Sequence, residues 1–136
     1  MARRRINQAD RDGSEFVALP HVVMDSQAFL SLSGPAVRLL LDMARQFKGH
    51  NNGRLVACSK YLKKRGWKSH DTATRAKREL EGAGLVFETR KGARPNKASW
   101  YAVTWIGLDW SPEMDVSAKA LPRGQYLRWK PAGSPE

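Results

Sequence analysis

The sequence lacks the long apolar runs that mark membrane and secreted proteins. No stretch approaches the roughly 18 consecutive apolar residues of a membrane-spanning helix. The first five residues, Met1 to Arg5, are followed by polar residues and not by the apolar core of a signal peptide. We therefore expect a cytoplasmic protein that does not associate with membranes.

Cysteine and histidine are also scarce. Cys58 is the single cysteine, which excludes an internal disulfide and a zinc site with several cysteines, and we expect it to be a small core residue. The three histidines are scattered, with no carboxylate pair at ligand spacing. The sequence contains no P-loop, Rossmann glycine pattern or nucleophile elbow. These absences predict a protein that is not an enzyme and holds no metal or cofactor.

Acidic residues are few beside the basic ones, 13 against 24, so the net charge is +11. Residues 48–97 carry +10 of this excess, whereas residues 1–47 carry +1 and residues 98–136 carry none. Hydrophobic residues make up 41% of the chain, enough for a folded core. A surface that only confers solubility does not need its charge in one third of the chain, so the pattern favours a polyanionic partner.

The length of 136 residues suits one small domain with two polar ends. We expect residues 1–14 to form a flexible basic arm, residues 15–110 to form the folded domain and residues 111–136 to form an extended tail. The tail holds large apolar residues that are unfavourable in an exposed chain. They can pack on their own domain, contact a second protomer or bind another protein.

Capping residues and apolar spacing predict four helices. Asp25 or Ser26 can cap a brief first helix, and Ser33 begins a longer one that ends before Gly49. Residues 59–65 suit a two-turn helix, and Ser69 can cap a fourth that runs to about Ala83. In the helix after Ser33 the apolar stripe contains Ala36, Leu39, Leu40, Met43 and Phe47, opposite Arg38, Asp42 and Arg45. In the last helix the buried face contains Ala73, Ala76, Leu80 and Ala83.

Three segments have the composition of strands. Residues 54–57 form a short strand candidate, and residues 85–90 and 98–105 flank a basic, turn-prone stretch. These last two segments predict a β-hairpin with a cationic tip. The order of elements, a helix, a short strand, two helices and a hairpin, is that of an α+β winged helix-turn-helix.

Five runs of the sequence carry a resemblance to a known family: Gly53-Arg54-Leu55-Val56, Tyr61 to Trp67, Thr72 to Leu80, Gly84-Leu85-Val86 and Pro95 to Tyr101. Over about residues 16–110 the chain resembles the winged helix-turn-helix DNA-binding proteins of bacterial plasmids, phages and other mobile elements. The resemblance implies a three-helix core with a short strand and a C-terminal β-hairpin wing, and it implies DNA binding. Some of these proteins serve replication or plasmid maintenance.

The helix after Ser69 is the candidate recognition helix. A helix in the major groove packs by one face and presents hydrogen-bonding and cationic side chains on the other. Arginine can bind guanine or a phosphate, and Asp71 can accept from cytosine or favour the helix N-terminus. The candidate DNA-contacting residues of this helix are Ser69, His70, Asp71, Thr74, Arg75 and Arg78.

Three further groups are candidates for contact with the DNA backbone or the minor groove. The preceding helix and turn supply Lys60, Lys63, Lys64, Arg65 and Lys68. The wing supplies Arg90, Lys91, Arg94, Asn96 and Lys97, which can instead protect the edge of the hairpin. The arm supplies Arg3, Arg4 and Arg5, although short basic termini are common.

The sequence leaves more than one function open. The leading hypothesis is a sequence-specific duplex-DNA-binding protein, either a transcriptional regulator or a replication or segregation factor of a mobile element. The alternatives are a binder of RNA or single strands that stacks bases on Trp67, Trp100, Tyr101 and Trp105, and a DNA-anchored adaptor whose tail docks on a protein. A homodimer formed through the tail is a further possibility. Core packing is the expected role of the four aromatic residues.

Overall fold

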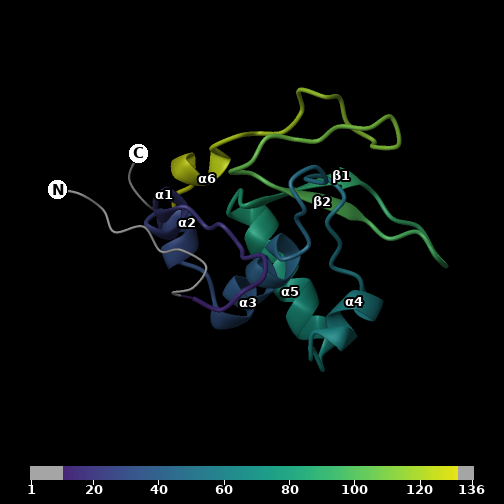
Figure 1. Cartoon of the computed structure of the whole chain (residues 1–136), viewed down its shortest axis with the longest axis horizontal. Helices are drawn as coiled ribbons and strands as arrows, with labels where there is room; N and C mark the ends of the chain where they lie inside the picture. The colour runs from purple at the N-terminus through teal and green to yellow at the C-terminus, as the bar shows by residue number, and fades with distance from the viewer. Residues whose placement is uncertain (1–10, 132–136) are drawn as a thin grey trace.

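The computed structural model describes residues 11–131 and shows an α+β chain of short helices and one two-stranded antiparallel sheet (Figure 1). The helices are α1 (His21–Met24), α2 (Gln27–Leu30), α3 (Gly34–Ala44), α4 (Ser59–Lys64), α5 (His70–Gly82) and α6 (Gln125–Arg128). The strands are β1 (Val86–Arg90) and β2 (Trp100–Val103). Helix α1 was not expected from the sequence, whereas α2 to α5 lie where capping and spacing predict them.

Serine caps decide where the helices begin. The side-chain oxygen of Ser26 accepts a hydrogen bond from Phe29 N, that of Ser33 from Ala36 N, and that of Ser69 from Thr72 N. Each cap satisfies a backbone donor that the first turn would leave unpaired. The sequence-based assignment of the caps is therefore confirmed for α2, α3 and α5.

Helices α3 and α5 form the centre of the core. Leu39, Leu40 and Met43 on α3 are fully buried, and α5 buries Ala76 and Leu80 against them. Small alanine side chains allow the two helix backbones to approach closely. A polar link reinforces this packing, because the Glu79 carboxylate accepts from Ser33 N at 2.8 Å and from Ser33 Oγ at 2.7 Å.

The sheet is the expected hairpin, with Val86 paired to Val103 and Glu88 paired to Tyr101. The expected strand at residues 54–57 is reduced to one bridge, in which Leu55 pairs with Tyr101. At the next residue, Val56, the side chain of Gln46 takes the place of a neighbouring strand as the hydrogen-bond partner. Gln46 Nε2 donates to Val56 O at 2.7 Å, and Val56 N donates to Gln46 Oε1 at 2.9 Å.

Asp42 corrects the sequence analysis of α3. Helical spacing placed it on the solvent face, but the residue is only 5% exposed. Its carboxylate accepts from Trp67 Nε1 at 2.7 Å and from Arg65 Nε at 2.9 Å, and its backbone oxygen accepts from Tyr61 Oη at 2.6 Å. Two donors after α4 thus satisfy a charge that spacing alone would leave in water, and Tyr61 of α4 adds a third contact to the backbone of the same residue.

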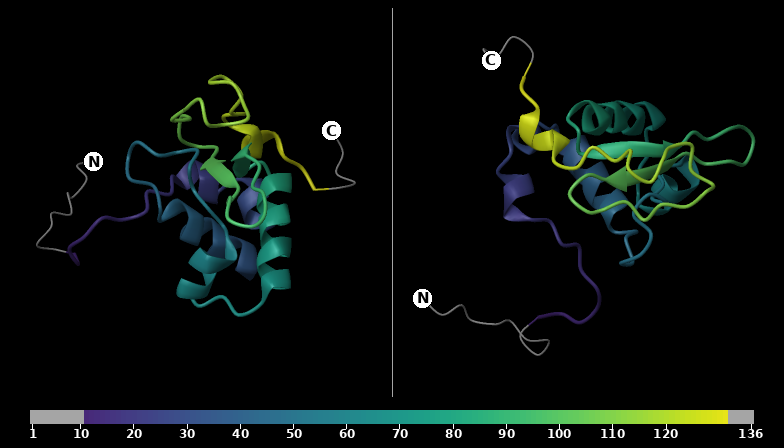
Figure 2. Two further views of the ribbon diagram at one scale, coloured as in Figure 1. Left: turned by 90° about the vertical axis from the view of Figure 1, so that its right-hand side faces the viewer. Right: turned by 90° about the horizontal axis from the view of Figure 1, so that it is seen from above.

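The described part of the expected extended tail is packed on the domain. Residues 117–124 lead into α6, which contacts α2, and Tyr126 on α6 is 4% exposed (Figures 1 and 2). Gly84 lies close beneath α6, since a Cβ there would lie 3.1 Å from Tyr126 N. Of the arrangements considered for the apolar residues of the tail, the structure shows packing against their own domain for Tyr126 and Trp129, whereas Leu127 is 56% exposed.

We predict that Asp42→Ala lowers the free energy of unfolding by about 2–4 kcal/mol, because the buried Trp67 N–H and the Arg65 guanidinium lose their acceptor. Urea unfolding followed by tryptophan fluorescence measures the change. Asp25→Ala, at an exposed position, is the matched control and should change stability by less than about 0.5 kcal/mol. Equal effects of the two substitutions would contradict the role given to Asp42.

Candidate nucleic-acid interface

Helix α5 presents one polar face away from the core. His70, Asp71, Arg75 and Arg78 are exposed, while Thr74 is half-buried with its Oγ1 at 3.5 Å from His70 Nε2. Ser69 is also exposed, but its Oγ is the N-cap acceptor of the helix. The structure therefore places the predicted recognition residues together on the outer face and N-terminal end of one rigidly packed helix.

The turn before α5 is tied to α3. Gly66 has a φ of +86°, and its place after α4 allows the chain to reverse without strain. Trp67 is buried, and Arg38 of α3 lies over its ring with Cζ 4.8 Å from the centroid. Arg38 Nη2 also donates to Arg65 O at 2.6 Å. These contacts fix the position at which α5 begins.

The cations of α4 and its turn fall into two classes. The side chains left exposed without a described ion pair or hydrogen bond are those of Lys60, Lys63, Lys64 and Lys68. Arg65 instead binds Asp42, and the hydrogen bond to that carboxylate raises the pKa of Arg65. Of the five predicted backbone contacts, Arg65 is thus held as a structural tie to α3.

The wing also contains both exposed cations and one cation that is held in a structural contact. Its exposed polar residues are Lys91, Arg94, Asn96 and Lys97, on a tip closed by the Ala93–Lys97 bridge. Arg90 differs, because its Cζ lies 3.5 Å from the centroid of the Trp100 ring and its Nη2 donates to Ala98 O at 2.8 Å. Arg90 packs at the base of the wing, whereas the other four residues surround its tip.

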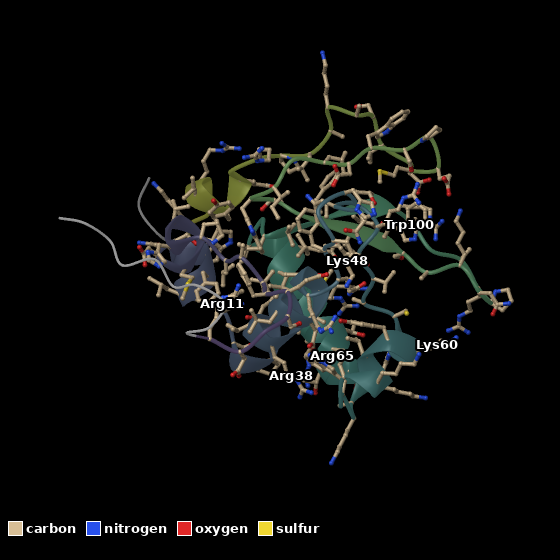
Figure 3. The ribbon with its side chains drawn as sticks, in the orientation of Figure 1. Arg11, Arg38, Lys48, Lys60, Arg65 and Trp100 are labelled. Carbon is tan, nitrogen blue, oxygen red and sulfur yellow. The ribbon has the colours of Figure 1, made fainter. Side chains whose placement is uncertain are left out.

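Three groups of exposed cations lie toward one side of the molecule. In Figure 1 the α4 helix and the tip of the wing lie at the right-hand side and the turn that leads into α5 lies below α4, and Figure 3 labels Lys60 on the outer side of α4. Figure 2, with this side toward the viewer, shows the hairpin beside α4 and α5. Residues 3–5 of the arm lie outside the described residues.

The aromatic residues considered for base stacking are mostly covered. Trp67 and Tyr101 are buried, Trp105 packs against the core, and the guanidinium of Arg90 lies on the ring of Trp100. Single-strand binders stack bases on accessible ring faces. The structure assigns these rings to packing, as the sequence analysis expected.

Two cations near this side were missed by sequence reasoning. Arg38 belongs to α3 and contacts the turn, and Lys77 of α5 lies over the Tyr101 ring with Nζ 5.7 Å from its centroid. The spacing of Arg38 four residues before Asp42 was the available signal for the first, and a 4.0 Å ion pair joins the two. No residue near Lys77 in the sequence indicates its contact with the Tyr101 ring, because the two residues are 24 positions apart.

The contact between α5 and the sheet perturbs two acids. Burial raises the pKa of the Tyr101 phenol above its usual value of 10.0, and the nearby Glu81 and Glu88 raise it further. Burial likewise raises the pKa of Glu81, while Lys77 opposes the shift. Tyr101 is 1% exposed, and its hydroxyl lies 3.4 Å from Glu88 Oε2. This part of α5 is therefore a packing surface with acidic neighbours, away from the N-terminal cations.

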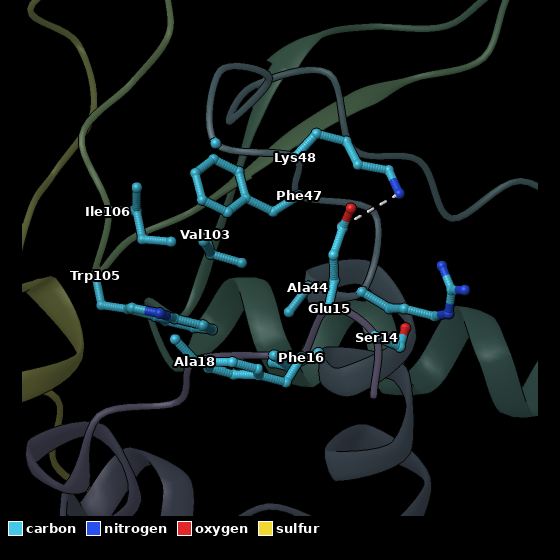
Figure 4. Close-up of a pocket in the computed structure, with 13 residues that line it drawn as sticks. Ser14, Glu15, Phe16, Ala18, Ala44, Phe47, Lys48, Val103, Trp105 and Ile106 are labelled. Atoms are coloured by element: carbon cyan, nitrogen blue, oxygen red, sulfur yellow. Dashed lines mark ion pairs between the residues drawn. The ribbon is translucent and has the colours of Figure 1, made fainter. Parts of the chain in front are cut away.

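A cavity of about 830 Å³ lies at the end of β2 that is farther from the wing (Figure 4). Its apolar walls include Phe16, Phe47, Val103 and Trp105, and Trp105 Nε1 is buried without a hydrogen-bond partner within residues 11–131. Lys48 at its rim is paired with Glu15 at 3.7 Å. The cavity is separate from the wing tip and the start of α5.

Searches against protein families, curated proteins and solved structures found no match for this chain. Within residues 11–131 no group of three or more His, Cys, Asp or Glu side chains could hold a metal ion. No helix in the described part is long and apolar enough to cross a membrane. The basis for a functional proposal is therefore the arrangement of the described side chains.

We predict that unfolding stability falls as the pH rises above about 10, and that Tyr101 contributes to this fall. Its pKa is higher in the folded state, so the unfolded chain releases this proton first, and the stabilisation present below pH 10 is lost at higher pH. Between the two pKa values of Tyr101, the free energy of unfolding falls by up to about 1.4 kcal/mol per pH unit because of this one proton. Urea unfolding from about pH 9 to about pH 11.5 should show a shallower decline for Tyr101→Phe. Identical slopes would exclude this role for the phenol.

Proposed function

We propose that this chain is a winged helix-turn-helix protein that binds duplex DNA with sequence preference. In this proposal α3, α4 and α5 are the three-helix core, the Leu55 bridge is the short strand, and the β1–β2 hairpin is the wing. The observation that supports it most is the outer face of α5. That helix is packed on α3 by small apolar residues, and its free face carries two arginines beside other exposed cations.

The proposed roles follow from position and chemistry. Arg75 and Arg78 can each form two parallel hydrogen bonds with guanine O6 and N7, while His70 and Thr74 reach a base edge or a phosphate from the first turns. Lys60, Lys63, Lys64 and Lys68 neutralise phosphates and set the register on the duplex. The wing tip, through Lys91, Arg94, Asn96 and Lys97, binds the minor groove or the adjoining backbone.

The burial of the aromatic residues favours duplex DNA over single strands as the partner. Trp67 and Tyr101 would have to leave the core to stack on bases, and Trp100 would have to lose its contact with Arg90. The resemblance to proteins of mobile elements supports a role as a transcriptional regulator or as a replication or segregation factor. We propose no catalytic step for the chain.

The first test is the salt dependence of DNA binding. If about five to eight phosphates are neutralised, log K should fall against log salt with a slope of about −4 to −7. Fluorescence anisotropy with a random-sequence duplex, and with a single strand of the same length, measures both affinity and slope. A slope near zero, or equal affinity for the single strand, would contradict the proposal.

The second test separates base reading from phosphate binding. After selection of a preferred duplex from a random pool, Arg75→Ala should weaken binding to it by about 1–3 kcal/mol and relax the preference at particular base pairs. Lys63→Ala should weaken preferred and random duplexes alike. Lys119→Ala, an exposed cation after the sheet, is the control and should have no effect on either. Equal losses on both duplexes for Arg75→Ala would show that α5 does not read bases.

A further inference from the structure

Residues 108–116 form a segment without helix or strand that crosses the sheet, and we call it the strap. Figure 1 shows it above the sheet, with α5 on the other side, and Figure 2 shows from above that it overlies the strands. Its sequence carries no helical or strand periodicity. Its contacts therefore decide what it does.

The first end of the strap is fixed to the core at Asn52. Asp109 N donates to Asn52 O at 2.8 Å, and Asn52 N donates to Asp109 Oδ2 at 2.8 Å. Asn52 is itself fully buried, and its side chain both donates to Val103 O and accepts from Val103 N. This end of the strap is anchored, through Asn52, at Val103, the last residue of β2.

The second end of the strap holds the base of the wing. Asp115 N donates to Thr89 O at 2.8 Å, and Lys91 N donates to Asp115 Oδ2 at 2.7 Å. These bonds fall where the pairing of β1 with β2 becomes irregular, between Glu88 and Arg90. Asp115 thus supplies an acceptor for Lys91 where the ladder between the strands ends.

The middle of the strap packs against Gly53, a position whose backbone conformation favours glycine. Gly53 has a φ of +125°, and a Cβ there would lie 2.7 Å from Met114 Cε. Met114 is buried, and Trp110 Nε1 donates to Val116 O at 2.7 Å, which closes the strap on itself. The strap is consequently a packed element that can transmit the rigidity of the core to the wing.

We infer that the strap orients the wing for DNA binding and that Asp115 is its positioning residue; this inference rests on the proposed function. Asp115 need not touch DNA, because its carboxylate is engaged with the Lys91 backbone on the way to the tip. A wing held in its binding orientation loses less conformational freedom on binding than a loose one. Asp115 therefore raises the affinity supplied by the exposed cations of the tip.

The sign of the effect separates this role from simple electrostatics. Removing a carboxylate beside a cationic wing should strengthen DNA binding if only charge matters. Loss of the acceptor for Lys91 N should weaken it. We expect Asp115→Ala to weaken binding to the preferred duplex roughly five- to twentyfold. Asp115→Asn, which removes the charge and keeps an acceptor oxygen, should retain most of the wild-type affinity.

A double-mutant cycle shows whether Asp115 acts through the wing. In a background with Arg94→Gln and Lys97→Gln, which removes two of the three cations of the tip and leaves Lys91 in place, Asp115→Ala should change affinity by less than about twofold. Amide hydrogen exchange should accelerate across residues 91–97 in Asp115→Ala, with α3 and α5 unchanged. This exchange pattern distinguishes a loosened wing from a destabilised domain.

Each outcome bears on one of the two proposals. Wild-type affinity or tighter binding in Asp115→Ala, with DNA binding intact in the wild type, would overturn the inference alone. The same would follow if Asp115→Ala weakened binding equally in the background with Arg94→Gln and Lys97→Gln. Failure of the wild-type chain to bind any duplex would overturn the proposed function, and with it the role of the strap.

Discussion

The buried carboxylate of Asp42 is the contact on which the arrangement of the helices depends. It lies on α3 and accepts hydrogen bonds from Arg65 and Trp67, which flank the turn into α5. A buried carboxylate without donors would be strongly unfavourable, so folds that move this turn away from α3 are disfavoured. The direction of α5, and with it the orientation of its cationic face, is therefore coupled to one acid on another helix.

The basic side chains divide between structural and exposed roles. Arg65 binds Asp42, Arg38 covers Trp67, and Arg90 covers Trp100, so these guanidiniums stabilise the turn and the wing. Arginine suits such sites because its planar group can stack on a ring and hydrogen-bond at the same time. Lysine predominates among the exposed cations of α4 and its turn. A surface that binds phosphates needs positive charge more than a fixed side-chain geometry, and lysine supplies such a charge on a flexible side chain.

The sequence predicts the features that depend on neighbours along the chain. The caps at Ser33 and Ser69 and the alanine face of α5 follow from spacing within one helix, and the structure confirms them. The exposure of Arg75 and Arg78 follows from the same spacing. The features that the sequence did not predict are contacts between residues in different elements. One example is the Gln46 side chain, which hydrogen-bonds the backbone of Val56 where a strand partner was expected. Such contacts leave no periodic signal, so neither the burial of Asp42 nor the strap was predicted.

The uneven charge of the chain has a structural counterpart. A two-stranded hairpin is marginally stable alone, and this one is supported by α5, by the Leu55 bridge and by the strap. The strap belongs to residues 98–136, which carry no net charge, whereas the tip of the wing belongs to the strongly basic middle of the chain. Cations that repel one another destabilise a compact hairpin. Residues 98–136 therefore supply packing and hydrogen-bond partners at the base of the wing, while the charged tip of the wing stays exposed.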